Sequence, residues 1–316
     1  MNIFCIVTTY KNRYNFLKKV INRLVAEKIY RILIIDNNVS PDFKKKLKIL
    51  KRKNPEIELL IFDNNQGTAK AISDGLEMAM NSKKVDYIWI LDDDNLPSEN
   101  SARFLIKKFT TLKGGRKKVL TPIRYKLKQY QEYLEGYYNF KFYENNFIKF
   151  NFINNLIRTF HKKKYFVKDV ATIQMAPYGG LFFHKSLEKN VGLPNQKFHT
   201  YGDDYEYTLR MTKKRYQILL CKDYLIKDID KTFGVSRYFE KDTDEKKMYL
   251  QIRNHTFLSR SFIKNLYFYK TNMYIFIIYM VLKNIFRVTD PIFFYKRVVL
   301  ILEAIKHGDK KKLKQC

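Results

Sequence analysis

Cysteine is scarce in this sequence, and the lack of cysteine pairs excludes two common kinds of stabilisation. The three cysteines, Cys5, Cys221 and Cys316, lie far apart along the chain. No two of them have the spacing of a zinc site, and together they form no disulfide framework of the kind found in small secreted domains. The cysteine content therefore fits a protein that works in a reducing cytosol.

Long hydrophobic runs are also missing. The longest apolar run, residues 273–282, contains ten residues, whereas a helix that spans a bilayer needs about 20. The sequence starts with a strand-like segment, residues 3–7, and has neither the charged start nor the cleavage site of a signal peptide. We therefore expect a cytoplasmic protein without a membrane-spanning helix.

Acidic residues are few, since 31 Asp and Glu stand against 61 Lys and Arg and give a formal net charge of +30. Such a charge favours an anionic partner, which could be nucleic acid, anionic lipid or a phosphorylated substrate. Some of the lysine could instead be tolerated surface that reflects nucleotide bias in the coding genome. Because 46% of the residues are hydrophobic and 16% are aromatic, we expect a packed core and not a disordered chain.

The sequence does contain a regular alternation of strand and helix patterns. Four short apolar segments, residues 2–8, 31–36, 58–62 and 87–91, alternate with segments of helical periodicity. This order predicts an α/β fold with a mostly parallel central sheet flanked by helices. Each of these segments ends in polar residues, and ligands of such sheets bind at the carboxyl ends of the strands, so we expect a polar pocket there.

The last of these strands runs into three consecutive carboxylates, Asp92, Asp93 and Asp94. A solvated turn or a helix cap would account for one acid, but three adjacent acids repel one another and need compensation. Carboxylate oxygens are the ligands that hard divalent cations prefer. Asp92 and Asp94 alternate along the extended chain and can point to the same side, so the sequence predicts a metal site at this strand end.

A second acidic cluster, Asp203, Asp204 and Glu206, stands at the start of a helix pattern over residues 205–214. An acid at a helix N-terminus contributes about 0.3–1 kcal/mol as a cap or dipole partner. Capping explains one acid there, but it does not explain two acids beside Glu206. We therefore expect a chemical role for this cluster.

Basic and aromatic residues are interleaved between the two acidic clusters. Residues 103–168 contain 17 Lys or Arg against three acids, and residues 124–168 contain 14 aromatic residues. This pattern could bind single-stranded nucleic acid, could lie on an anionic membrane, or could be an insertion whose aromatic residues form a core. A second basic aromatic stretch, residues 262–307, reads as two helices broken near Asp290 and Pro291.

The motifs taken together resemble glycosyltransferase family 2, whose members have the GT-A fold, and are most similar to its galactofuranosyl- and rhamnosyltransferase branch. They occur in the family's order over nearly the whole chain. The residues that carry the resemblance are Thr8-Thr9-Tyr10-Lys11-Asn12-Arg13, Asp36-Asn37-Asn38, Asn65-Gln66-Gly67-Thr68-Ala69, Asp92-Asp93-Asp94, Gly179-Gly180, Gly202-Asp203-Asp204-Tyr205-Glu206-Tyr207, Tyr249 with Arg253-Asn254, and residues 302–312.

The resemblance implies a domain organisation. Residues 1–260 would form the GT-A domain, with a nucleotide-binding half at 1–122, a basic aromatic insertion at 123–168 and an acceptor-binding half at 169–260. Residues 261–316 would form basic aromatic helices that associate with the membrane.

The resemblance also implies roles for individual residues. Mn²⁺ or Mg²⁺ would be held mainly by Asp94, with Asp92 as second ligand or ribose contact, and Asp228 stands where the branch has a histidine ligand. Without Asp228, the site would rely on two aspartates and water. Arg13 would contact phosphate, or would be a surface residue at a helix start. The nucleotide sugar would lie against Thr8, Thr9, Tyr10, Arg13, Asp36, Asn38, Asn65, Gly67, Asp92 and Asp93.

Family 2 enzymes invert the anomeric centre, which requires a general base for the acceptor hydroxyl. Asp204 would be that base, with Asp203 as runner-up or as the partner that orients the acceptor. Glu206 would raise the proton affinity of the base. The acceptor would lie against Tyr178, Gly179 and Gly180, where the branch has a tryptophan pair that this chain lacks.

These features predict an inverting, metal-dependent glycosyltransferase that uses a UDP- or dTDP-linked sugar, with UDP-galactofuranose as one candidate. The acceptor would be a saccharide or lipid-linked saccharide of bacterial cell-surface polysaccharide synthesis, and anionic membrane would be a further partner. The alternatives are a nucleic-acid-binding basic protein and an inactive membrane-associated scaffold of the same fold. Two acidic clusters would repel nucleic acid, so we expect no nucleic-acid partner. The sequence makes no prediction of oligomeric state.

Overall fold

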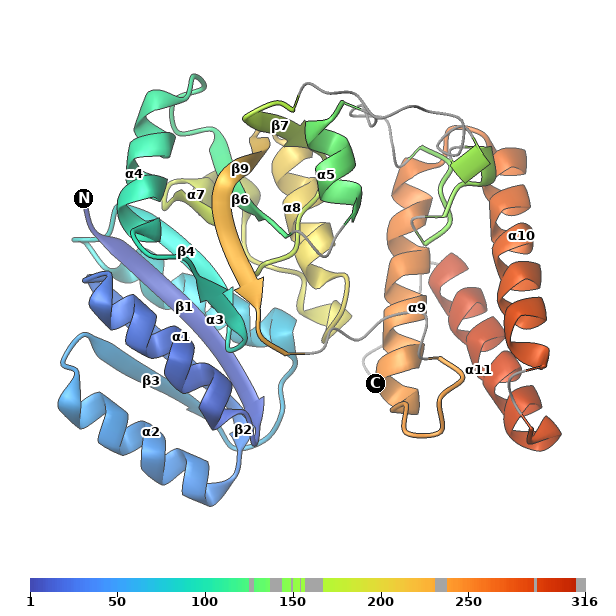
Figure 1. The fold of residues 1–316 in the computed structure, drawn as a ribbon, viewed down its shortest axis with the longest axis horizontal. Helices are drawn as coiled ribbons and strands as arrows, with labels where there is room; N and C mark the ends of the chain where they lie inside the picture. Colours follow the sequence, from blue (N-terminus) through green and yellow to red (C-terminus); the bar gives the residue numbers. More distant parts are fainter. Residues whose placement is uncertain are drawn as a thin grey trace. The chain divides into compact units, whose positions relative to one another are not determined.

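A computed structural model describes residues 1–124, 128–136, 144–148, 150–153, 155–156, 167–230, 238–286 and 289–310 (Figure 1). The chain forms two compact units. The first, the sheet unit, consists of Met1–Tyr137, Tyr165–His199 and Asp203–Lys231. The second, the helical unit, consists of Tyr138–Lys164, Thr200–Gly202 and Thr232–Cys316.

The first half of the sheet unit has the predicted parallel strands. They are β1 (Ile3–Lys11), β2 (Arg31–Val39), β3 (Ile57–Phe62) and β4 (Tyr87–Asp92). All pairs are parallel and the order is β3-β2-β1-β4, so β1 lies between β2 and β4. Thr8 therefore stands in register with Asp92, next to the end of β4.

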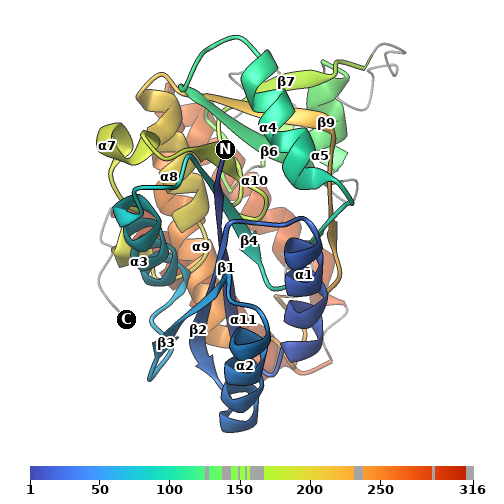
Figure 2. The same ribbon diagram turned by 90° about the vertical axis from the view of Figure 1, so that its left-hand side faces the viewer.

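Helices cover both faces of these strands, because the strands are apolar on both sides. Cys5 and Val7 of β1 pack in one cluster with Leu17 and Val20 of α1 (Tyr14–Ala26). On the other face, α3 (Thr68–Asn81) approaches so closely that a Cβ at Gly75 would lie 2.9 Å from Ile6. In Figure 2, α1 and α3 lie on opposite sides of β1. The other two helices of this half are α2 (Pro41–Lys53) and α4 (Ser101–Thr111).

The second half of the sheet is not mostly parallel, which corrects the prediction. β8 (Phe182–His184) runs antiparallel between β4 and β6 (Lys118–Ile123). β9 (Gln217–Asp228) pairs in parallel with β6 but antiparallel with β5 (Asn95–Pro97) and β7 (Val170–Ile173). Within the described residues, four strand pairs are parallel and four are antiparallel. The short helical segments of this half are α5 (Lys128–Leu134), α7 (Leu187–Val191), η1 (Gln196–Phe198) and α8 (Asp203–Lys213).

The helical unit consists of α9 (Glu245–Ser259), η3 (Arg260–Phe262), α10 (Leu266–Ile285) and α11 (Pro291–Asp309). The expected break at Asp290 and Pro291 is present, and the Asp290 side chain caps α11. The predicted boundary at residue 260 falls inside this unit, since α9 packs with α10 and α11. The core of the helical unit contains Met248, Ile252, Tyr269, Phe276, Met280, Ile301, Ala304 and Ile305.

The predicted basic aromatic insertion, residues 123–168, lies largely outside the described residues. Among its described aromatic residues, Tyr130, Tyr133 and Phe147 are buried, and Phe152 is exposed. These three buried rings fit the alternative in which the aromatic residues of the insertion form a core. In the parts of the chain described above, no helix is long and apolar enough to cross a membrane.

Candidate active site

The triple aspartate lies where β4 leaves the buried sheet. Residues 87–91 are buried on both faces, and the next residues turn out of the strand. Thr8 Oγ1, on the neighbouring strand, donates to Asp92 Oδ1 at 3.4 Å, and Thr9 Oγ1 donates to Asp93 Oδ2 at 2.7 Å. The hydrogen bond to Asp93 is therefore short and holds its side chain in place, whereas the hydrogen bond to Asp92 is long and weak.

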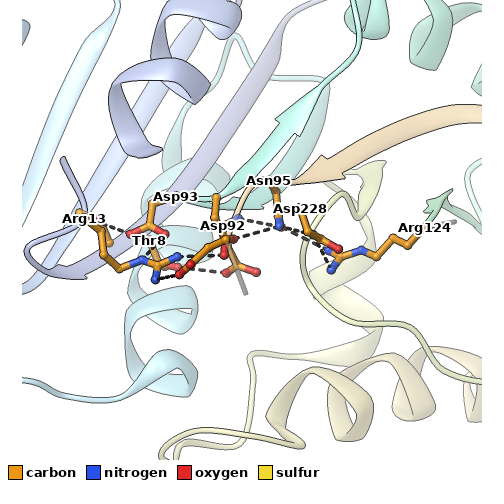
Figure 3. A network of polar contacts seen from close by, with 10 residues as sticks. Thr8, Arg13, Asp92, Asp93, Asn95, Arg124 and Asp228 are labelled. Atoms are coloured by element: carbon orange, nitrogen blue, oxygen red, sulfur yellow. Dashed lines mark hydrogen bonds and ion pairs between the residues drawn. The ribbon is translucent and has the colours of Figure 1, made fainter. Parts of the chain in front are cut away.

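Arg13 pairs with two of these acids and offsets part of their mutual repulsion (Figure 3). Arg13 occupies the N-cap position of α1, directly after β1. Its Nε donates to Asp93 and its Nη2 to Asp94, each at 2.8 Å, and its Nη1 contacts Asp230. Arg13 thus contacts three carboxylates and keeps 18% of its side chain exposed. Tyr10 flanks the guanidinium, whose carbon lies 5.6 Å from the ring centroid.

The pairing of β5 with β9 brings Asp228 to the same place. Asn95 stands opposite Asp228 in that antiparallel ladder. Its Nδ2 donates to Asp94 Oδ1 at 3.1 Å and to Asp228 Oδ1 at 2.9 Å. The structure thus joins Asp94 and Asp228 through an amide that sequence reasoning had not assigned.

Arg124, at the end of β6, is the second cation of the site and was also missed. It is largely buried, and its Nη1 lies 3.0 Å from Asp228 Oδ1. Its Nη2 donates to the carbonyl of Gly179 at 2.8 Å. Because a Cβ at Gly179 would lie 1.9 Å from Asn95 and 2.1 Å from Arg124, the glycine leaves room for these two side chains. Gly180, which has a φ of +96°, is closely packed as well, because a Cβ there would clash with the side chain of Pro122.

A hydrogen-bond relay fixes this glycine turn to the core. The single tryptophan, Trp89 of β4, donates from Nε1 to the hydroxyl of Tyr224 at 2.6 Å. That hydroxyl donates to the carbonyl of Gly180 at 2.9 Å. The tryptophan therefore supports the turn that precedes β8 from inside the sheet. Tyr178, on the other side of the turn, is buried beside Tyr207 of α8.

The second acidic cluster begins α8. Asp203 is 2% exposed, and its Oδ2 accepts no hydrogen bond from any described residue. Asp204 is only half-buried, and its Oδ1 accepts from the backbone N–H of Tyr205 at 2.8 Å. Glu206 is held by Arg210 one helical turn later, with Oε1 at 2.6 Å from Nε. Since its charge is paired, Glu206 is poorly placed to raise the proton affinity of a base.

Electrostatics connects the two acidic clusters. The pKa of Asp92 is raised to about 7, mainly by burial and next by the negative charge of Asp94. Asp204 adds to this rise, and the positive charge of Arg124 opposes it. Burial and Asp204 raise the pKa of Asp203 well above its usual value, and Asp92 adds to the effect. Acids that lie more than a hundred residues apart in the sequence are thus close enough in the fold to influence one another's pKa. Burial also raises the pKa of Asp93 to about 6, although Arg13 and Thr9 oppose this rise.

The ends of β2 and β3 carry the remaining predicted nucleotide residues. Asp36 is fully buried, its Oδ1 accepts from the N–H of Val39 at 2.7 Å, and its Oδ2 has no described hydrogen-bond donor. Asn38 is exposed, with φ of +73°. Asn65 is exposed as well, and its side chain accepts from the N–H of Gly67 at 2.9 Å.

Gly67 has a packing role in this structure. It is buried with φ of +81°, and a Cβ there would lie 2.3 Å from the carbonyl oxygen of His199. The same carbonyl accepts from the N–H of Ala69 at 3.1 Å. The glycine therefore fastens the start of α3 to the loop that precedes α8.

The donor set fits a hard divalent cation. Asp92, Asp94 and Asp228 offer only carboxylate oxygens, which suit Mg²⁺ and Mn²⁺. Asp92 is held by one long hydrogen bond, and burial, followed by the charge of Asp94, raises its pKa. The described residues contain no group of three His, Cys, Asp or Glu side chains already gathered to hold a metal ion. The assignment of Asp92, Asp94 and Asp228 as metal ligands thus stays a prediction.

The chain belongs to glycosyl transferase family 2, because residues 5–170, more than half of its 316 residues, match the sequence profile described as "Glycosyl transferase family 2". The predicted family is thereby confirmed. No curated protein is significantly similar to the chain in sequence.

Many solved structures have a similar fold, among them the following two. GalNAc-T7 with UDP, GalNAc and Mn²⁺ is similar with a TM-score of 0.57 and 11% identity, over 82% of this chain and 48% of that one. The mannosyltransferase PcManGT from Pyrobaculum calidifontis, in complex with GDP-Man and Mn²⁺, is similar with a TM-score of 0.55 and 13% identity, over 98% of this chain and 76% of that one. The chain thus spans about half the length of the GalNAc-T7 structure. These similarities confirm the α/β fold with a central sheet flanked by helices.

Proposed function

We propose that this chain transfers a sugar from a nucleotide diphosphate sugar to a saccharide or lipid-linked acceptor, with the help of Mn²⁺ or Mg²⁺. The observation that carries the proposal is the electrostatic connection between the acids at the end of β4 and those at the start of α8. Glycosyl transfer needs these two functions side by side, one for the leaving group and one for the acceptor proton. The two similar structures, which contain UDP or GDP-Man together with Mn²⁺, support the choice of donor and cation.

Asp94 and Asp92 would hold the cation, with Asp228 as the third carboxylate. A divalent cation there neutralises the diphosphate as it leaves. Asn95 orients two of these side chains, because its amide donates to both Asp94 and Asp228. Thr8, Thr9, Tyr10, Asp36, Asn38, Asn65 and Gly67 would lie along the donor nucleotide at the neighbouring strand ends.

Asp204 is the proposed general base, and Asp203 the partner that orients the acceptor. Asp204 is the more exposed of the two and can reach an acceptor hydroxyl. Asp203 is buried with a raised pKa, so its carboxyl group holds a proton more readily and can donate a hydrogen bond. An acid in one position and a base in the other would suit an inverting transfer.

The finer assignment rests on the resemblance of the motifs. It includes the galactofuranosyl- or rhamnosyltransferase branch, a UDP- or dTDP-linked donor and a place in bacterial cell-surface polysaccharide synthesis. It also includes an acceptor at Tyr178, Gly179 and Gly180, and a peripheral position at the inner face of the membrane. Because Asn95 and Arg124 fill the room beside Gly179, the acceptor would contact the turn from its other side.

The test is donor binding followed by turnover. Purified protein is heated with Mn²⁺ and a panel of nucleotide sugars, and the expected result is a rise in melting temperature with one UDP- or dTDP-linked donor. Asp94→Asn should abolish that rise, whereas Asp204→Asn should keep it and stop nucleotide release in the presence of acceptor. Absence of a rise with every donor, alongside salt-sensitive binding of RNA, would overturn the proposal in favour of the nucleic-acid-binding alternative.

A further inference from the structure

The helical unit exposes an apolar helix face that its own core does not use. On α10, Tyr267, Tyr274, Ile278, Leu282 and Ile285 are 86%, 56%, 56%, 60% and 45% exposed. These positions recur at intervals of three, four or seven residues, so they form one stripe along the helix. We call this stripe the α10 outer face.

The opposite face of α10 is the one that holds the unit together. Tyr269, Phe276 and Met280 are buried in the core that α10 shares with α9 and α11. The helix is thus apolar on both sides, and only one side is explained by folding. Exposed rings and aliphatic side chains continue into the start of α11, where Ile292 is 68% exposed and Tyr295 is 69% exposed.

The charges on α10 itself are of one sign. α10 carries Lys270 and Lys283, both exposed, and contains no acidic residue. Lys264, just before the helix, and Lys296, on α11, are exposed as well. Lys283 Nζ lies 5.5 Å from the centroid of the Tyr279 ring, so the charged end of this lysine contacts an aromatic side chain of the same helix. The partner of this face should therefore be both apolar and anionic.

A second copy of the chain fits this requirement poorly. An association of two such faces would bring lysine against lysine, between chains with a formal net charge of +30 each. An anionic bilayer offers acyl chains to the rings and aliphatic groups, and phosphate to the lysines. Tyrosine and lysine are also the side chains that place an apolar body in the membrane and a polar end in the headgroup layer.

We propose that the α10 outer face docks the protein on an anionic lipid bilayer, with α10 lying in the plane of the interface. Since no described helix is apolar enough to cross a membrane, a helix along the surface is the arrangement that this composition allows. The inference deepens and rests on the proposed function, because docking would present the transferase to a lipid-linked acceptor. It names the membrane surface as the partner.

The experiment measures binding of the full chain to vesicles, without donor or metal. Vesicles of phosphatidylcholine alone are compared with vesicles that also contain phosphatidylglycerol, and bound protein is separated by flotation. We expect binding to the anionic vesicles that weakens with salt. The double variant Ile278→Ser and Leu282→Ser should bind at least about tenfold more weakly, because it removes two apolar side chains from the contact.

A matched control removes two exposed isoleucines from the sheet unit. Ile49→Ser with Ile61→Ser changes side chains that are 51% and 40% exposed, and it should bind like the wild type. All four positions are exposed, so both double variants should keep the wild-type circular dichroism spectrum and melting temperature. The variant Lys270→Gln with Lys283→Gln should lose the preference for anionic lipid.

Equal binding of the Ile278 and Leu282 double variant and the wild type would overturn the proposal. So would a wild-type dimer in sedimentation that this double variant turns into monomer, since the face would then be an interface between copies. If the wild type does not bind vesicles but a donor still stabilises it, the docking surface is refuted and the proposed function is kept. If the wild type binds vesicles but no donor stabilises it, the proposed function is refuted and the docking surface is kept.

Discussion

Nη2 of Arg13 lies 2.8 Å from Oδ2 of Asp94, the residue that we propose as the main metal ligand. The same side chain reaches Asp93 and Asp230, so three carboxylates share one positive charge. Arg13 thus provides part of the compensation that a run of adjacent acids requires, and Arg124 lowers the pKa of Asp92 as well. A divalent cation would provide the same compensation with two charges, and the two cations compete for Asp94.

Arg13→Gln removes this charge and should lower the free energy of unfolding of the metal-free protein. We expect a loss of about 3 kcal/mol, the lower end for breaking a buried pair, because Arg13 keeps 18% of its side chain exposed. Mn²⁺ should stabilise the variant more than it stabilises the wild type, as the cation takes over the compensation. Urea unfolding with and without Mn²⁺ measures both effects.

The control for Arg13 is a surface pair of similar type. Arg31 lies 2.6 Å from Glu58, with both side chains about one third exposed (35% and 33%). Arg31→Gln should cost no more than about 1 kcal/mol and should leave the response to Mn²⁺ unchanged. If Arg13→Gln behaves like Arg31→Gln, the guanidinium does not compensate the acids.

Substitution of the acids at the start of α8 should separate catalysis from donor binding. Asp204→Asn is expected to reduce turnover by about 10²–10⁴-fold, the usual contribution of a general base, while the donor-induced rise in melting temperature persists. Asp203→Asn should reduce turnover less, because an amide can still donate a hydrogen bond to the acceptor. Turnover and thermal stabilisation are measured on the same preparations.

Glu206→Gln serves as the comparison on the same helix. It disturbs the pair with Arg210 and leaves Asp203 and Asp204 in place, so we expect a small loss of stability and nearly normal turnover. Full turnover of Asp204→Asn would contradict its assignment as the base. A loss in Glu206→Gln as large as in Asp204→Asn would show that the cluster acts as a whole.

Gly179→Ala should disturb the network that joins Asp94 to Asp228. The added Cβ would clash with the side chains of both Asn95 and Arg124. We therefore expect a destabilisation of about 1–3 kcal/mol, which is typical of overpacking. The same substitution in an Asn95→Ala background should cost less, because one obstacle is gone. A double-mutant cycle in urea gives the coupling between the two positions, and additive costs would contradict the clash.

The stability of the metal-free protein should fall as pH rises from about 4 to about 7. The raised pKa values of Asp92, about 7, and Asp93, about 6, mean that the folded state holds protons that the unfolded state has released in this range. The unfolded state then binds fewer protons, so the free energy of unfolding decreases with pH.

Mn²⁺ should reverse this trend. A metal binds the deprotonated carboxylates, so its effect on the melting temperature should grow across the same pH range. Asp92→Asn should flatten both curves. An Mn²⁺ effect of equal size at low and neutral pH would argue against these carboxylates as ligands.

The sequence was sufficient for the first half of the fold. Four apolar segments with polar ends predicted the parallel strands. In the structure Thr8 lies beside Asp92, as expected for residues at the carboxyl ends of neighbouring parallel strands. The direction of β8 was not predictable in the same way. A strand of three residues has no periodicity to read, and its pairing with both β4 and β6 is a long-range property.

The site was only partly predictable for a similar reason. Asn95 and Arg124 have no local signature, and they acquire their roles when β9 pairs with β5 and β6. Glu206 is different, because Arg210 follows it by four residues on a predicted helix. That spacing is the ordinary signal of an intrahelical ion pair, and it would have identified a charge already compensated.

The position of Trp89 provides a way to observe the two units separately. It is the single tryptophan of the chain, and it lies fully buried in the sheet unit. Its emission therefore reports melting of the sheet unit alone, whereas far-ultraviolet ellipticity reports the helices of both units. If the two signals melt at one temperature, the units unfold cooperatively. If they differ, the interval between them measures how independently the helical unit holds its fold.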